Sequence, residues 1–161
     1  MELRIIPLEI PKDCNIIVGH THFIKSVEDL YEIMVSISPH AKFGIAFSEA
    51  SGPCLIRYEG NEKELSDAAI RNAENLGCGH VFIILLRNGY PINFLNAIKN
   101  CQEVCTVHCA TANPVQVIVA ESEQGRGILG VIDGFTHKGV EGESHQRERK
   151  ELLRKFGYKL G

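Results

Sequence analysis

Apolar residues along this chain fall into eight short runs that are rich in Ile, Val and Phe and are bounded by turn-forming residues. Such runs are typical of β-strands. The predicted strands cover residues 3–10, 15–21, 42–48, 54–58, 81–86, 104–110, 115–121 and 128–132. The run at 81–86 is apolar throughout, which indicates a strand that is covered on both faces.

Helical spacing and capping signals separate several of these strands. Ser26 and Asn61 are each followed three residues later by an acidic residue, a spacing close to the capping box, and they predict the starts of two helices. The second helix is expected to end before Gly77, a typical helix stop. Pro91 predicts the first turn of a third helix. The charged segment 144–156 predicts a fourth helix with a solvated face.

The order of these elements predicts a single compact α/β domain over residues 1–161, with a mixed β-sheet of about seven or eight strands and four helices. A chain of this length defaults to one domain. Consecutive strands joined by short turns imply antiparallel pairs, and strand–helix–strand stretches imply some parallel ones. The strand order stays open at this level.

The composition argues against several classes of protein. The chain is 44% hydrophobic and 23% charged with a net charge of −3, which argues against a general binder of nucleic acid or of acidic membranes. The opening Met1-Glu2-Leu3-Arg4 has no secretory signal character. The longest apolar run is too short to span a bilayer. We therefore expect a cytoplasmic protein with no membrane partner.

Six cysteines are present without a Cys-x-x-Cys spacing, and in a cytoplasmic protein they are expected to be reduced. Cys105, His108 and Cys109, together with Cys101, are candidate metal ligands. Residues 108 and 109 face opposite ways on a strand, so buried structural thiols are the better interpretation and no metal site is predicted.

The segment from Glu121 to Gly142 carries six glycines, interleaved with Arg126, Asp133, His137 and Lys138. Glycine lets backbone approach a ligand closely, so this segment suits the mouth of a small-molecule site. Residues 125–130 match G-x-G-x-x-G, but a strand follows in place of a helix, which makes a dinucleotide fingerprint weak. A phosphate-covering turn and a plain hairpin both remain open.

Polar side chains also gather where strands end. His20 and His22 follow one strand with Lys25 close by, and three interpretations compete: half of a metal site, a nucleophile, or ordinary polar residues. Glu49 follows another strand and is suited either to bind sugar hydroxyls or to hold its own turn. The Asn88 amide is suited to a purine edge.

Five long motifs together resemble those of a known protein family. They are HFIKSVEDLY at 22–31, KFGIAFSEASGP at 42–53, LRNGYPIN at 86–93, CATANP at 109–114 and QGRGILGVIDG at 124–134. With these motifs the chain closely resembles the adenosine-specific kinase family, found mostly in archaea and some thermophilic bacteria. The resemblance covers nearly the whole chain.

The resemblance implies a compact α/β protein that binds adenosine or AMP but neither ADP nor ATP. It also implies a histidine that carries phosphate, and a homo-oligomer, for which a trimer is our expectation. His22 is our choice for that histidine, because it lies inside one of the motifs and near Lys25; His137 is second. No P-loop or protein-kinase signature is present.

The function predicted on this basis is an adenosine kinase that acts through a phosphohistidine, with no certain cofactor and an unnamed phosphoryl donor. The expected catalytic residues are His22, Lys25 and Glu49. The expected ligand-binding residues are Asn88, Asn113, Gln124, Gly125, Arg126, Gly127, Asp133 and Lys138. Lys25 and Arg126 would neutralise phosphate charge, and Glu49 or Asp133 would orient the sugar.

Two other functions stay open. The first is a non-catalytic adenosine or AMP sensor, in which bound phosphate is incidental. The second is a metal-dependent hydrolase that uses His20, His22 and a cysteine.

Overall fold

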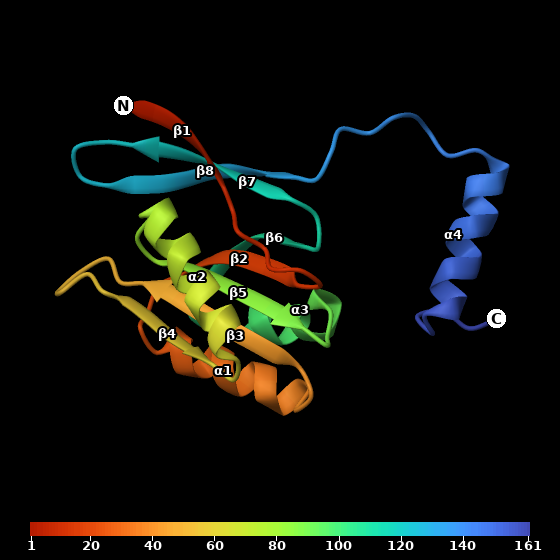
Figure 1. Cartoon of the computed structure of the whole chain (residues 1–161), viewed down its shortest axis with the longest axis horizontal. Helices are drawn as coiled ribbons and strands as arrows, with labels where there is room; N and C mark the ends of the chain where they lie inside the picture. Colours follow the sequence, from red (N-terminus) through yellow and green to blue (C-terminus); the bar gives the residue numbers. More distant parts are fainter.

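The chain forms eight strands and four helices in a computed structural model that describes all residues 1–161 (Figure 1). The elements are β1 (Glu2–Pro7), β2 (Asn15–Thr21), α1 (Ser26–Ile37), β3 (Lys42–Ser48), β4 (Ile56–Gly60), α2 (Lys63–Leu76), β5 (Val81–Arg87), α3 (Pro91–Asn100), β6 (Val104–Thr111), β7 (Val115–Glu121), β8 (Arg126–Asp133) and α4 (Glu143–Lys155). The predicted α/β class, the eight strands and the four helices are confirmed.

The strands form two antiparallel sheets in place of one mixed sheet. The larger sheet has the order β4-β3-β5-β2-β6 and the smaller has the order β1-β7-β8. The expected parallel pairs are absent for a topological reason. Strands β2 and β3, which α1 connects, do run in the same direction, but β5 lies between them and pairs antiparallel with both. The connections over α2 and α3 skip one strand in the same way.

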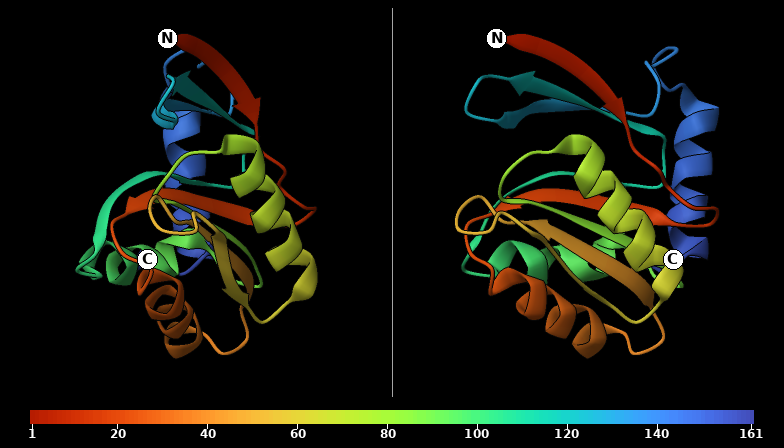
Figure 2. Two further views of the ribbon diagram at one scale, coloured as in Figure 1. Left: turned by 90° about the vertical axis from the view of Figure 1, so that its left-hand side faces the viewer. Right: turned by 60° about the vertical axis from the view of Figure 1, so that its left-hand side comes forward.

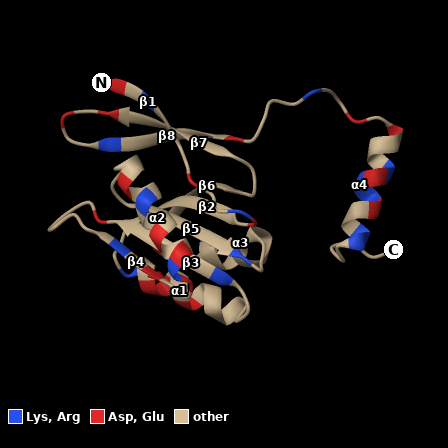
Figure 3. Cartoon of the chain, in the orientation of Figure 1, with Lys and Arg blue, Asp and Glu red and all other residues tan.

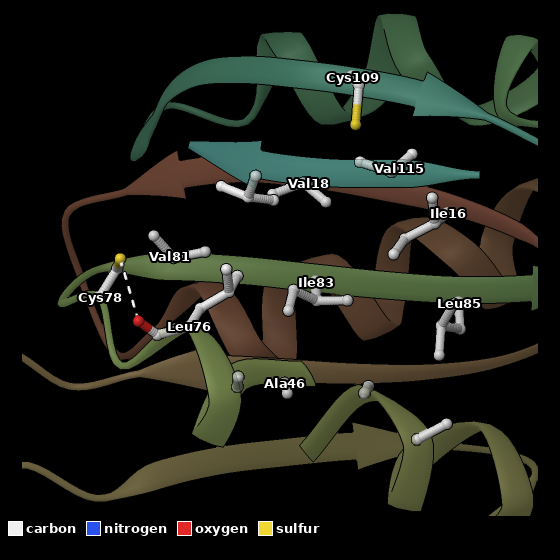
Figure 4. Packing of buried hydrophobic residues seen from close by; sticks show 14 of the residues in the cluster. Ile16, Val18, Ala46, Leu76, Cys78, Val81, Ile83, Leu85, Cys109 and Val115 are labelled. Atoms are coloured by element: carbon white, nitrogen blue, oxygen red, sulfur yellow. Dashed lines mark hydrogen bonds between the residues drawn. The ribbon is translucent and has the colours of Figure 1, made fainter. Parts of the chain in front are cut away.

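Two hydrophobic clusters cover the two faces of the five-stranded sheet. A cluster of 17 buried residues lies between this sheet, α2 and the three-stranded sheet (Figure 4). A cluster of 13 lies on the opposite face, against α1 and α3. Figure 2 shows the resulting layers. Alternate residues of β5 enter opposite clusters, Ile83 one and Ile84 the other, which confirms that the apolar run is a strand covered on both faces.

Both predicted helix N-caps are wrong, because tertiary hydrogen bonds occupy the side chains. The Ser26 hydroxyl is buried and lies 2.5 Å from the Thr21 hydroxyl. The Asn61 amide accepts from the Phe43 N–H and donates to the Ala41 carbonyl, both at 2.8 Å. Lys25 and Glu62 occupy the cap positions without a side-chain cap bond. The predicted stop at Gly77 is confirmed by its left-handed φ of 61°.

The cysteines do not all fit the expectation of buried structural thiols. All six are free; Cys14, Cys78 and Cys109 are buried, whereas Cys54 and Cys105 are exposed. Cys105 lies on β6, an edge strand of its sheet. None of the helices has the length and apolar character that crossing a membrane requires.

Candidate functional site

One end of the five-stranded sheet gathers several of the predicted site residues. Strands β2 and β3 finish there, and β5 and β6 begin there. Backbone hydrogen bonds tie these strand ends together: the His80 N–H donates to the Ser48 carbonyl at 2.7 Å, and the Thr21 N–H donates to the His80 carbonyl at 2.9 Å. His22 and Glu49 therefore follow strands that finish at the same end of the sheet.

A hollow of about 660 Å³ opens at this end, and we refer to it as the hairpin pocket. Its walls come from the turn after β3 (residues 48–56), the end of α2 with the loop that follows it (73–79), and the β7–β8 hairpin (120–127). These three segments lie on the left in Figure 1. The volume is in the usual range for small-molecule sites.

The glycine-rich motif forms the turn of the β7–β8 hairpin. A Cβ added at Gly125 or Gly127 would meet no atom within 4 Å, so both backbones border open space and both residues line the pocket. The Ser122 N–H donates to the Gly125 carbonyl at 2.9 Å and closes the turn. Gln124 lies in the same turn and also lines the pocket. The expected strand after the motif is confirmed as β8.

Arg126 joins this hairpin to α2. Its Nη1 donates to the carbonyls of Asn75 at 3.3 Å and Leu76 at 3.4 Å, where the negative end of the helix dipole favours a cation. Its Nε lies 3.3 Å from a Glu121 carboxylate oxygen. The Arg126 guanidinium, which was expected to neutralise phosphate charge, is thus already paired with Glu121 in the pocket wall.

Glu49 holds the turn that forms the opposite wall. One carboxylate oxygen accepts from the Leu55 N–H and the other from Arg57 Nη2, both at 2.8 Å. The Leu55 N–H and then the Arg57 guanidinium lower the pKa of this carboxyl below its usual value. A carboxylate with a lowered pKa is a weak base but a good acceptor for sugar hydroxyls.

His22 and Lys25 lie beyond the end of β2. The exposed His22 ring stacks on Phe23 with centroids 5.9 Å apart. The Lys25 ammonium contacts the Asp29 carboxylate and lies 3.8 Å from the Glu103 carboxylate, and the hydrogen bond to Asp29 is the main reason why its pKa is raised.

A second hollow lies between Lys25 and the hairpin pocket, whereas His22 lines neither hollow. The second hollow measures about 490 Å³ and is lined by Lys25 and Arg57, among others. Ile56 lines both hollows, so the two lie side by side across β4.

The remaining predicted ligand-binding residues lie at the other end of the molecule. Asn88 follows β5, and Asn113 lies in the β6–β7 turn, where its amide donates to Asp133 at 3.2 Å. Lys138 lies in the extended segment after β8. Figure 1 shows these segments on the right, opposite the hairpin turn. Within one chain they do not reach the hairpin pocket.

The segment Gly77–His80 between α2 and β5 was not predicted from the sequence to lie near the pocket. A Cβ at Gly79 would lie 2.9 Å from the Ala50 Cβ, so glycine allows this loop to approach the turn after β3. His80 has a φ of 58°, which is uncommon for a residue with a side chain and recurs at functional sites. Its ring stacks on Phe47 and approaches His20. The run Gly-Cys-Gly-His after a helix was the available signal.

Two neighbouring groups have shifted pKa values that limit their chemistry. Burial raises the pKa of the Cys78 thiol, and this thiol donates to the Leu76 carbonyl at 3.5 Å (Figure 4). Burial, with smaller contributions from His80 and His108, lowers the pKa of His20. Cys78 is thereby kept as a thiol, and His20 as a neutral imidazole.

At one place, three side chains that could bind a metal ion lie near one another. Ligand atoms of Asp29, Cys101 and Glu103 lie within 4.8 Å of one another. The Lys25 ammonium already lies against both carboxylates, so the protein supplies a cation there itself. His20 and His22, the ligands of the hydrolase hypothesis, are outside this group.

Comparisons with known proteins give matches that cover nearly the whole chain. The family model described as adenosine-specific kinase matches residues 6–159. Among solved structures, the crystal structure of the PH1918 protein from Pyrococcus horikoshii OT3 is similar, with a TM-score of 0.94 and 44% sequence identity over 99% of each chain. No curated protein matches the chain.

Proposed function

Because the chain belongs to the adenosine-specific kinase family, as its motifs indicated, we propose that it binds adenosine or AMP in the hairpin pocket and phosphorylates adenosine through a phosphohistidine. The observation that carries this proposal is that two family motifs, 42–53 and 124–134, are distant in sequence but form facing walls of one pocket. The glycine backbone of the hairpin and the Glu49 carboxylate supply donors and acceptors for a nucleoside.

The proposed reaction has two transfers. First, the neutral His22 imidazole attacks the phosphorus of a phosphoryl donor, so that a P–N bond forms and the donor's P–O bond breaks. Then the ribose 5′-oxygen attacks this phosphorus, the P–N bond breaks, and the hydroxyl proton passes to solvent or to a carboxylate. Lys25 and Arg126 would offset phosphate charge, and Glu49 would orient the sugar.

Assembly into an oligomer would bring a further set of residues to the nucleoside, namely Asn88, Asn113, Asp133 and Lys138. They lie at the end of the chain that is opposite the hairpin pocket, so a contact with the nucleoside would have to come from a neighbouring copy. This fits the homo-oligomer that the family resemblance implied and the trimer that we expect. A cytoplasmic location stays a prediction.

Adenosine binding tests the pocket. In Gly125→Leu a bulky side chain is added in the hairpin turn that lines the pocket, and calorimetry should show at least a tenfold weaker Kd for adenosine. Gly130→Leu is the matched control, since it lies in the same hairpin, also borders open space and does not line the pocket. Equal affinity in both variants would place the nucleoside elsewhere.

AMP formation tests the histidine. With a panel of phosphoryl donors, His22→Ala should lose at least a hundredfold in AMP formation while its adenosine Kd changes less than twofold. The exposed His40→Ala is the control. Mass spectrometry at neutral or alkaline pH should find the labile phosphate on His22, because phosphohistidine hydrolyses in acid. Undiminished AMP formation in His22→Ala would remove this residue from the mechanism.

A non-catalytic sensor is the second candidate function, and the ion pairs and hydrogen bonds of the expected catalytic residues favour it. Arg126 is paired with Glu121, Lys25 with Asp29, and Glu49 is held by two donors, so the charged groups expected to act in catalysis are already engaged within the protein. The sensor predicts adenosine binding in wild-type protein with no AMP from any donor tested.

A further inference from the structure

The outer face of the three-stranded sheet is apolar, although it faces solvent. Pairing places Leu3 opposite Ala120 and Ile5 opposite Ile118, and Ile132 lies on the same face. Leu3 is 64% exposed and Ile5 61% exposed. The solvated face of an antiparallel sheet is normally polar. An apolar face of this kind marks an interaction surface.

The C-terminal residues 134–161, which we call the arm, also lack a partner. The segment 134–142 leads away from the body to α4 (Figure 1), and no residue of α4 is buried. Leu152 and Phe156 are 49% and 60% exposed. An isolated helix of 13 residues is marginal in water, so α4 requires a surface on which to pack.

The arm does not reach the apolar sheet face of its own chain. Gly134 donates to the Pro114 carbonyl where the arm leaves the body, and Phe156 and Tyr158 line a hollow of about 500 Å³ beside Tyr90 and Leu95. This hollow is next to α3, on the other side of the five-stranded sheet from β1, β7 and β8.

The net charges of the arm and of the rest of the chain indicate which surface the arm binds. Residues 134–161 carry seven basic and four acidic residues, a net charge of +3, whereas residues 1–133 carry ten basic and sixteen acidic residues, a net charge of −6. Figure 3 shows the blue-rich α4 apart from a body with acidic helices. An arm is therefore attracted to the body of another copy. Two bodies packed face to face would repel each other.

We propose that the arm of one copy packs on the outer face of the β1–β7–β8 sheet of a second copy. Leu152 and Phe156 would cover Leu3, Ile5 and the exposed Leu129. The contact joins two different surfaces, so it closes into a ring when the rotation permits. This inference goes beyond the proposed function, because it concerns assembly and requires neither nucleoside nor phosphohistidine.

Assembly of the full chain provides the first test. By light scattering after gel filtration, the wild type should be an oligomer at micromolar concentration. Leu129→Glu on the sheet and Leu152→Glu on the arm should each give monomers, with circular dichroism unchanged. Ile37→Glu, at an exposed position on α1, should stay oligomeric. A monomeric wild type, or an oligomer that survives both substitutions, would overturn the proposal.

A crosslink decides whether the contact is between chains. In a background with the exposed Cys54 and Cys105 replaced by Ser, Leu129→Cys and Leu152→Cys proteins are mixed and oxidised. A disulfide-linked dimer that needs both variants is the expected result. When both substitutions are placed in one chain and diluted, a crosslink only within that chain would show that the arm folds back, and would refute the proposal.

Discussion

At the residue scale, buried polar side chains and glycines perform tasks that their sequence context does not reveal. Ser26 and Asn61 have the sequence signature of helix caps, yet both make hydrogen bonds to residues in other elements. Glu49 was expected either to bind a sugar or to hold its turn, and in the structure it holds the turn. Its remaining lone pairs are still available to a ligand.

Gly44 shows how closely two elements approach. A Cβ at this position would lie 2.2 Å from the Ser66 backbone nitrogen, because α2 packs directly on β3. Gly44→Ala should therefore lower the free energy of unfolding by about 3 kcal/mol. Gly125→Ala, where a Cβ meets nothing within 4 Å, is the control and should stay within about 0.5 kcal/mol of wild type. Urea unfolding measures both, and equal values would contradict this packing.

Cys109 makes stability depend on alkaline pH. Burial, with a smaller contribution from Asp133, raises the pKa of this thiol from 9.0 to about 11. Its stabilising effect is complete below pH 9 and is lost as pH rises to 11, because the unfolded chain releases this proton first. Over this range, the stability of wild type should fall about 1.4 kcal/mol per pH unit more than that of Cys109→Ala. Urea unfolding under reducing conditions measures the two slopes, and parallel slopes would contradict the assignment.

At the scale of elements, helix α2 links the two sheets. Arg126 of β8 donates to its last carbonyls, and Asn72 fixes the segment after β1. The Asn72 amide accepts from the Glu9 N–H and donates to the Glu9 carbonyl, both at 2.8 Å. The wall of the hairpin pocket thus depends on contacts between elements that are far apart in the sequence.

Removal of the Asn72 amide tests this link. Asn72→Ala leaves the Glu9 N–H and carbonyl without partners beside a fully buried position, so it should lower the free energy of unfolding by about 2 kcal/mol. Arg71→Ala removes an exposed ion pair to the same Glu9 and should cost less than about 1 kcal/mol. Thermal unfolding followed by calorimetry compares the two variants; a larger loss in Arg71→Ala would reverse this assignment.

At the scale of the whole molecule, the two sheets share one core. Val117 and Val119 of the smaller sheet are in the same cluster as Ile83 and Leu85 of the larger sheet. The body should therefore unfold as one unit, while α4 contributes no buried residue to it.

Hydrogen exchange tests this cooperativity. Val117→Ala removes a fully buried side chain and should cost about 2 kcal/mol. The slowest amides of β5 should then exchange faster by the same factor as those of β7, because both exchange by global unfolding. Faster exchange confined to β1, β7 and β8 would show that the smaller sheet is a separate unit.

The sequence by itself determined the elements and the family. The ranges 15–21, 42–48 and 115–121 were predicted with the bounds that the structure gives them, because alternation and apolar runs are local properties. Gly77 ended its helix for an equally local reason, a left-handed φ. The long motifs identified the adenosine-specific kinase family, which the family model supports.

Only the tertiary structure decided which of these segments meet. It placed Glu49, Gln124, Gly125, Arg126 and Gly127 around one pocket, left Asn88, Asn113, Asp133 and Lys138 outside it, and added the unpredicted residues 78 and 79. Strand pairing and side-chain hydrogen bonds join residues that lie far apart in the chain, and no local pattern encodes the partner. For the same reason the division into two sheets, with one strand inserted between each helix-connected pair, could not be read from the order of the elements.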